Sequence, residues 1–267
     1  VTAADLRAAE ARFSPLEEAR LADGVAPEEA KRRIEGTLER LKGAGVVAIL
    51  RAKGCPEIAV RRGLELAGMG CKAMEVTMDA TDWPRILKEL REKLPADVDV
   101  GVGTIMDDTM DQLGLAVELG ATFILSPIDP TGFVEECNRR GVLAVPSAFT
   151  SNECWGLHRR GCRLIKLFHA GTISPAILKS MLDVTPLGQN LNIIPSGGVS
   201  PENAEKWWDA GVAAVGMGSN LVGQDIATTP GTPAHEAAEE EWAAKGKKVA
   251  ADLFAKVAER RRKQAKA

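Results

Sequence analysis

The sequence predicts an α/β protein folded as a single (β/α)8 TIM barrel with extra N-terminal helices, and three observations lead there. The chain's 267 residues are close to the roughly 250 that are typical of such a barrel. From Val46 onward, short apolar runs alternate with amphipathic stretches, which is typical of repeated β-α units. No dinucleotide-binding fingerprint follows the first run, which favours a closed barrel over an open doubly wound sheet.

Eight apolar runs rich in β-branched residues are the expected strands, because strands buried on both faces have this composition. They are Val46 to Leu50, Ala73 to Met78, Val98 to Ile105, Thr122 to Ser126, Leu143 to Ser147, Leu164 to Phe168, Asn192 to Pro195 and Ala213 to Met217. The expected helices between them are Pro56 to Met69, Trp83 to Leu94, Thr109 to Leu119, Thr131 to Arg139, Ser151 to Arg159, Ser174 to Met181 and Pro201 to Asp209.

Local signals mark the ends of several of these helices. Ser200 is expected to cap the last one, with Pro201 at its first helical position. Glycine is favoured just after a helix because it adopts left-handed backbone angles easily. The glycines expected to end five helices are Gly70, Gly120, Gly141, Gly161 and Gly211.

The chain divides into a helical extension, residues 1–45, and the barrel with its C-terminal helix, residues 46–267. The segment Val1 to Leu41 predicts two helices, split near Ala22 to Pro27, that either plug the N-terminal mouth of the barrel or pack on a neighbour. After Gly223, a loop rich in Thr, Pro and Gly leads to Pro233. The Ala/Glu/Lys-rich stretch beyond it is the expected closing helix.

Composition excludes several functional classes. The net charge of −3 does not favour nonspecific binding to nucleic acid or to an anionic membrane. The five cysteines show neither CxxC spacing nor a histidine pattern suited to zinc. No apolar run is long enough to span a bilayer, so we expect a soluble, cytoplasmic protein. Because the chain begins at Val1, an organelle matrix or stroma reached by a removed targeting peptide stays open.

Active sites of such barrels lie at the C-terminal ends of the strands, where Lys166 is the first candidate. Strand alternation places it opposite Ile165 and Leu167. If those neighbours face the helices, the lysine points into the barrel, where burial disfavours the cation and the neutral amine can attack a ketone. Two alternatives are an ammonium group that reaches one barrel end and a pair with a buried carboxylate.

Glu75 occupies a matching position on the second expected strand, so closure of the barrel would let it face Lys166 across the interior. A carboxyl group there can shuttle protons at a substrate carbinolamine and at the carbon whose bond is broken. The alternative interpretation is a structural ion pair with Arg51 or Lys166.

Glycine-rich turns end the seventh and eighth expected strands. They are Ser196-Gly197-Gly198 and Gly216-Met217-Gly218-Ser219. Barrel enzymes frequently hold a phosphate at these two strand ends on backbone N–H groups, and glycine permits the close approach. The two turns together favour a phosphate site over simple tight turns.

Taken in order, these segments resemble the 2-keto-3-deoxy-6-phosphogluconate (KDPG) aldolase family, which includes 6-phosphogalactonate and 4-hydroxy-2-oxoglutarate aldolases. The resemblance covers roughly Val46 to Val222. The matching segments are Ala48 to Arg51, Glu75 to Thr77, Gly101 to Thr104, Ser126-Pro127, Ile165 to Phe168, Pro195 to Val199 and Gly216 to Ser219. Several matches in the same order and at the same strand ends are more specific than any one of them.

The resemblance implies a class I aldolase, a lyase of the Entner-Doudoroff type that cleaves 2-keto-3-deoxy-6-phosphogluconate to pyruvate and glyceraldehyde 3-phosphate. Lys166 would form the Schiff base and Glu75 would be the general acid and base. The implied substrate-binding residues are Arg51 and Thr104 at the carboxylate, Phe168 at the pyruvyl group, Pro127 in the pocket wall, and Ser196, Gly197, Gly198, Gly218 and Ser219 at the distal phosphate. The lysine is the electron sink, so no metal or organic cofactor is expected. The implied assembly is a homotrimer.

Three positions depart from the family pattern and leave the substrate open. Asp79 stands where many members carry an arginine near the carboxylate, so an anion replaces a cation there. His169 follows Phe168 where proline is usual, which makes it a candidate second proton-transfer group or a contact to the acyl chain. Ser147 replaces the usual glycine after Pro146 and narrows the pocket.

Rival interpretations follow from these departures. The nearest is a related aldolase for 2-keto-3-deoxy-6-phosphogalactonate, for 4-hydroxy-2-oxoglutarate or for a nonphosphorylated keto-deoxy sugar acid. A rival of another class is a phosphosugar-binding barrel without activity. A metal-dependent pyruvate aldolase is disfavoured, because His158, His169 and His235 lack ligand-like spacing with carboxylates.

Overall fold

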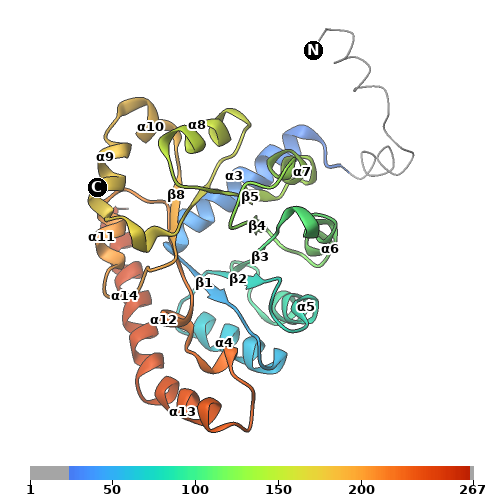
Figure 1. Cartoon of the computed structure of the whole chain (residues 1–267), viewed down its shortest axis with the longest axis vertical. Helices are drawn as coiled ribbons and strands as arrows, with labels where there is room; N and C mark the ends of the chain where they lie inside the picture. The colour runs from blue at the N-terminus through green and yellow to red at the C-terminus, as the bar shows by residue number, and fades with distance from the viewer. Residues whose placement is uncertain (1–23, 265–267) are drawn as a thin grey trace.

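The computed structural model describes residues 24–264, whose helices follow one another around a ring of parallel strands (Figure 1). The strands are β1 (Val46–Leu50), β2 (Ala73–Thr77), β3 (Asp99–Gly103), β4 (Phe123–Leu125), β5 (Leu143–Val145), β6 (Ser147–Ala148), β7 (Ile165–Phe168), β8 (Ile193–Ser196) and β9 (Val215–Met217). The α-helices are α3 (Pro27–Ala44), α4 (Pro56–Gly68), α5 (Trp83–Lys93), α6 (Gln112–Glu118), α7 (Phe133–Arg140), α8 (Ser151–Arg159), α9 (Pro175–Leu182), α10 (Thr185–Asn190), α11 (Ala204–Asp209), α12 (Ser219–Val222), α13 (Pro233–Glu241) and α14 (Lys247–Gln264). Single turns of 3-10 helix are η1 (Asp107–Thr109), η2 (Ala170–Thr172) and η3 (Asp225–Ala227), and a π-helical turn is η4 (Trp242–Gly246).

The sheet closes on itself through residues 143–148. Its strand order is β5-β4-β3-β2-β1-β9-β8-β7-β6, and all pairs are parallel. Strands β5 and β6 are two parts of one expected strand, separated by Pro146, which has no N–H to donate. Because β5 pairs with β4 and β6 pairs with β7, this segment joins both edges of the sheet. The predicted (β/α)8 barrel is confirmed, with its fifth strand interrupted.

Successive side chains of each strand face two different cores, as the two-residue repeat of a strand requires. Ile165 and Leu167 of β7 pack into the outer core, among side chains of the surrounding helices. Leu164, just before β7, packs with Ile194 in the inner core. Lys166 therefore points into the barrel, as the alternation predicted.

Helix α3 closes the N-terminal end of the barrel. Its buried side chains Ile34, Leu38, Leu41 and Ala44 share the inner core with the first residues of the strands. Of the two arrangements that the sequence allowed, a plug in the N-terminal mouth or packing on a neighbour, α3 adopts the plug. The first of the two predicted N-terminal helices lies outside the described residues.

The segment after β9 supplies the closing helices. Helix α13 continues through the π-helical turn η4 into α14, which lies between α4 and α11 (Figure 1). Lys247 is 3.0 Å from Glu65 of α4, and Arg260 is 2.9 Å from Asp209 of α11. No helix among residues 24–264 is both long and apolar enough to cross a membrane.

Most helix ends follow the sequence signals, but three helices start two or three residues later than predicted: α6 at Gln112, α7 at Phe133 and α11 at Ala204. Gly70, Gly120, Gly141, Gly161 and Gly211 all have positive φ, as expected of residues that end helices. Helix α11 begins at Ala204 instead of Pro201. The Ser200 hydroxyl donates to Glu202, and the Ser200 N–H donates to the Asn203 side chain at 2.9 Å. These local bonds hold residues 201–203 as a turn, since such side chains compete with the helix.

Candidate active site

A cavity of about 400 Å³ lies at the C-terminal ends of the strands, opposite the end that α3 closes. Its lining comprises Ile49, Arg51, Glu75, Thr104, Pro127, Lys166, Phe168, Ser196, Gly197, Gly218, Ser219, Val222, Gly223, Gln224, Ile226 and Ala227. The sequence-based candidates therefore come together in one site, except for two of them, Gly198 and His169.

Lys166 lies within β7 and is only 6% exposed. Its Nζ lies 4.9 Å from the centroid of the Phe168 ring, a cation–π distance. Its backbone N–H donates to the Pro146 carbonyl at 2.9 Å, across the interruption between β5 and β6. The amine thus lies beside an aromatic ring in the cavity, on a strand that is paired on both sides with neighbouring strands.

Glu75 is 1% exposed and faces the same cavity from β2. Space for its carboxylate comes from Gly103 on β3, where an added Cβ would lie 1.7 Å from Glu75 Oε1. Oε2 is buried and has no hydrogen-bond partner among the described residues. Arg51, one proposed partner of a structural ion pair, binds Asp79 instead. An unpaired buried carboxylate oxygen is destabilising, and such groups are concentrated at functional sites.

Thr104 follows β3 at the cavity wall and has a φ of 70°. Left-handed backbone angles are unfavourable for a β-branched residue. Strain of this kind persists where the surrounding structure imposes it, typically at binding sites. The backbone at Thr104 therefore supports its assignment to the site independently of the sequence motif.

Arg51 lies at the end of β1 and forms an ion pair with Asp79, which follows β2. Lys53 Nζ is 3.6 Å from the same carboxylate oxygen. Burial raises the pKa of Asp79, but the hydrogen bond from Arg51 and the charges of Arg51 and Lys53 outweigh it and keep the pKa below its ordinary value. Asp79, which differs from the family pattern, thus pairs with Arg51, the residue predicted to bind the substrate carboxylate.

The two glycine-rich turns meet at one side of the cavity. Ser196 and Gly197 line it after β8, and Gly218 and Ser219 line it after β9. Ser196 of β8 also pairs directly with Gly216 of β9. Backbone N–H groups of both turns are therefore available at one place, which suits an anion.

Gly198 and His169 lie beside the cavity. Gly198 has a φ of 91°, and a Cβ on it would lie 2.6 Å from Gly171 Cα, so only glycine fits there. The exposed ring of His169 stacks on Phe168 with 3.6 Å between centroids. Their functional roles stay predictions.

One wall of the cavity was not anticipated from the sequence. Residues 223–228, called the strap below, follow α12 and contribute Gly223, Gln224, Ile226 and Ala227 to the lining. Their position after the last strand was the available signal, because the loops at that end of a barrel build its active site. The recognised motifs end at Ser219 and do not include these residues.

A second cavity, of about 590 Å³, shares Pro127 and Phe168 with the first. Its charged residues are engaged in structural contacts. Arg160 is 2.6 Å from Asp129 and also pairs with Glu135, and Glu153 accepts the backbone N–H groups that begin α8. The smaller cavity, with its buried lysine and unpaired carboxylate oxygen, is therefore the better candidate for catalysis.

Among residues 24–264, no three side chains of His, Cys, Asp or Glu are grouped so that they could hold a metal ion. The buried thiols are also poor ligands, because burial raises the pKa of Cys71 and Cys162 to about 12.

Comparison with known proteins gives a consistent result. The family model "KDPG and KHG aldolase" matches residues 37–232, which extends beyond the Val46 to Val222 resemblance at both ends. The chain is similar to the 2-dehydro-3-deoxy-6-phosphogalactonate aldolase of Escherichia coli strain K12, at 27% identity over 65% of this chain and 89% of that protein. It is also 28% identical to the 2-dehydro-3-deoxy-phosphogluconate aldolase of Treponema pallidum, over 64% of this chain and 77% of the relative.

Solved structures share the fold. A KDPG aldolase from Legionella pneumophila, with pyruvate captured as a covalent carbinolamine, superposes with a TM-score of 0.64 at 22% identity, covering 82% of this chain and 97% of the other. A native KDPGal structure gives a TM-score of 0.62 at 23% identity, covering 80% and 94%.

Proposed function

Since this chain belongs to the KDPG and KHG aldolase family, we propose that it is a Schiff-base aldolase that cleaves a 2-keto-3-deoxy-6-phospho sugar acid to pyruvate and glyceraldehyde 3-phosphate. The observation that carries the proposal is the cavity in which a buried lysine, Lys166, and a buried carboxylate, Glu75, lie among the other predicted site residues.

The proposed reaction begins at Lys166. Its neutral amine attacks the keto carbon, C2, and loss of water from the carbinolamine gives the protonated Schiff base. Glu75 takes the proton of the C4 hydroxyl, so that this oxygen forms the aldehyde while the C3–C4 electron pair moves into an enamine. Protonation of C3 and hydrolysis then release pyruvate and return the free amine.

The remaining side chains are assigned by position along the substrate. Arg51 and Thr104 would bind the carboxylate, and Phe168, which lies beside the amine, would pack on the pyruvyl group. Pro127 would shape the wall. The distal phosphate would bind at the glycine-rich turns, on Ser196, Gly197, Gly198, Gly218 and Ser219.

The configuration at C4 separates the two leading substrates, 2-keto-3-deoxy-6-phosphogluconate and its galactonate epimer. Both give the same products. The sequence resemblance favours the gluconate acid, whereas the relative from Escherichia coli is a 6-phosphogalactonate aldolase. We therefore propose both as substrates and expect kcat/KM on the two purified epimers to rank them. Family resemblance also supports a homotrimer.

The test of this proposal is the mass of the intact protein after incubation with pyruvate and borohydride, followed by peptide mapping. We expect one reduced pyruvyl adduct, located on Lys166 and absent from Lys166→Ala. Lys179→Ala, which removes an exposed lysine from α9, is the matched control and should keep the adduct. A folded sample without an adduct would contradict the aldolase assignment and favour a phosphosugar-binding barrel.

A further inference from the structure

The strap carries the one amide side chain in the described lining of the cavity. Gln224 is exposed and lines the cavity five residues after Ser219, the last residue of the second glycine-rich turn. A primary amide offers two N–H donors and one carbonyl acceptor, so it can bind a phosphate oxygen or a sugar hydroxyl. Its position matters only if the strap is held in place.

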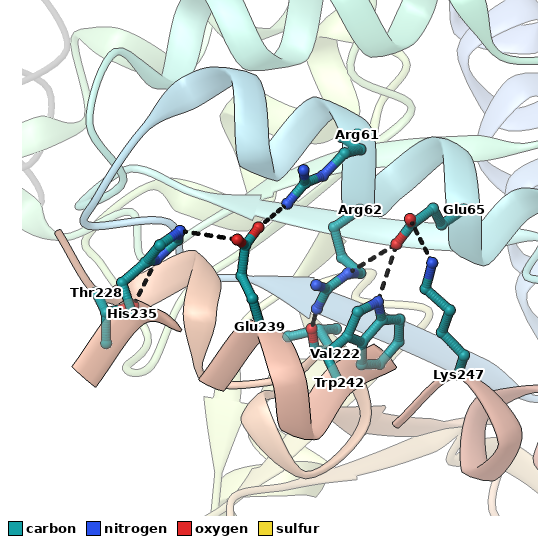
Figure 2. Close-up of polar contacts among 9 residues, drawn as sticks. All are labelled: Arg61, Arg62, Glu65, Val222, Thr228, His235, Glu239, Trp242 and Lys247. Atoms are coloured by element: carbon teal, nitrogen blue, oxygen red, sulfur yellow. Dashed lines mark hydrogen bonds and ion pairs between the residues drawn. The ribbon is translucent and has the colours of Figure 1, made fainter. Parts of the chain in front are cut away.

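The start of the strap is anchored by a buried arginine (Figure 2). Arg62 of α4 is 1% exposed and donates to the carbonyl of Val222, the residue before the strap. Its guanidinium carbon lies 3.6 Å from the centroid of the Trp242 ring, and its Nε donates to Glu65 at 3.2 Å. The indole N–H donates to the same carboxylate oxygen at 3.0 Å. Trp242 and Glu65 thus hold the Arg62 guanidinium in place, and Arg62 in turn holds the start of the strap.

The end of the strap is anchored from α13. His235 is 5% exposed, and its Nδ1 lies 3.0 Å from the Thr228 hydroxyl (Figure 2). Its Nε2 lies 3.6 Å from Glu239, which also pairs with Arg61 of α4. A third contact holds the middle of the strap, because the Gly54 N–H donates to the Ile226 carbonyl at 3.4 Å. Only glycine allows this approach, since a Cβ on Gly54 would lie 2.0 Å from the Thr228 carbonyl oxygen. The strap is therefore fixed at both ends.

We propose that Gln224 is a specificity-determining residue that binds the distal, phosphorylated half of the substrate, and that Arg62 and His235 are positioning residues that hold it there. This inference rests on the proposed function. It concerns the end of the substrate away from Lys166, so changes in the strap act on recognition of the distal half and leave Schiff-base formation unaffected.

The first test replaces Gln224 by glutamate. Gln224→Glu puts a negative charge beside the phosphate, so KM for the two 2-keto-3-deoxy-6-phospho acids should rise about tenfold or more, which corresponds to losing one charge-assisted hydrogen bond. KM for the nonphosphorylated acids should change less than about twofold. Gln189→Glu adds the same charge on exposed α10, away from the cavity, and should leave both values unchanged.

The pyruvate adduct distinguishes a failure of the proposed aldolase function from a failure of the proposed role of Gln224. An adduct on Lys166 together with an unchanged KM in Gln224→Glu would overturn the role of Gln224 and leave the aldolase intact. Equal increases of KM for phosphorylated and nonphosphorylated acids would also overturn it. A parent protein that forms no adduct would overturn the proposed function, and the inference with it.

The positioning role of His235 is tested by a double-mutant cycle. Gln224→Ala should lower kcat/KM for the phosphorylated acids about tenfold, and His235→Ala about threefold to fivefold. If His235 acts through Gln224, the double variant should lose no more than Gln224→Ala alone. Additive losses would contradict the positioning role, because they would show that the two residues act independently. Glu240→Ala, at an exposed position of the same helix, is the matched control.

Discussion

Glu75 has the least favourable surroundings of the residues in the cavity. Its side chain is buried, one carboxylate oxygen has no partner among the described residues, and a glycine on the next strand leaves room for the other. A residue selected for stability alone would be paired or apolar at such a place. The arrangement fits a group whose partner is the substrate.

Replacement of this carboxylate by an amide should separate catalysis from stability. Glu75→Gln should lower kcat by about 10²- to 10⁴-fold, since the amide cannot accept the proton of the C4 hydroxyl. The midpoint of thermal unfolding should change little, because glutamine has nearly the same size and Oε2 makes no hydrogen bond among the described residues that would be lost. Steady-state kinetics and calorimetry on the same samples check both effects.

The borohydride experiment supplies the control for this variant. The pyruvyl adduct on Lys166 should still form in Glu75→Gln, although more slowly. A variant that keeps full kcat, or one whose unfolding midpoint falls by several degrees, would show that Glu75 has a structural role instead.

For single residues, strand alternation predicted which side chains point into the barrel, and that rule holds within a strand. It placed Lys166 and Glu75 inside the barrel because each lies between neighbours that face the helices. It could not predict the ion pair of Arg51 with Asp79, which joins the ends of two adjacent strands. Such contacts depend on how loops leave the barrel, which a repeat pattern does not describe.

Among the elements, α3 makes the clearest energetic contribution. Leu41 is 1% exposed and packs into the inner core with side chains from several strands. Leu41→Ala should therefore reduce the free energy of unfolding by about 2 to 5 kcal/mol, the usual range for a buried leucine. Urea unfolding measures the change, and Glu39→Ala, on the exposed side of the same helix, should alter stability by less than about 0.5 kcal/mol.

The substitution Leu41→Ala should not change Schiff-base formation at the catalytic end of the barrel. The folded fraction of Leu41→Ala should still form the Lys166 adduct, because α3 lies at the opposite end of the strands. Loss of the adduct in a sample that remains folded would contradict the assignment of α3 to a structural role.

Most strands and helices were predictable to within two residues, whereas α6 and α11 begin three residues later than predicted and the irregular segments were missed. Strand β1 was predicted at its observed bounds, Val46–Leu50, because its five apolar residues are buried on both faces. Helix α10 was missed, since its six residues carry no apolar repeat and none of them is buried. The strap was missed as a cavity wall because its position depends on Arg62, which is distant in sequence from Val222 and the strap.

For the molecule as a whole, surface carboxylates should set the response to acid. The thiol of Cys55, the Glu57 backbone N–H and Arg85 lower the pKa of Glu57 to about 2, and Arg160 lowers that of Glu135. A carboxylate whose pKa is lower in the folded state stabilises the fold above its ordinary pKa, 4.5 for Glu. That contribution is lost as the pH falls through the folded value.

The unfolding midpoint should therefore decline as the pH is lowered from about 4.5 to about 2, and calorimetry over that range measures the decline. Arg160→Gln removes the partner of Glu135 and Asp129, so its decline should be shallower than that of the parent protein. A midpoint that is constant down to pH 2 would rule out this account.

Because α3 closes the N-terminal end of the barrel, substrates and products reach Lys166 from the C-terminal ends of the strands. Pyruvate bound covalently to Lys166 would sit between the inner core and the strap, while the aldehyde half would lie nearer the opening. Pyruvate stays bonded to Lys166 as the enamine after C3–C4 cleavage, so the aldehyde departs first. Because α3 closes the other end of the barrel, the aldehyde must leave past the strap, and the same segment that recognises the distal half of the substrate also borders its way out.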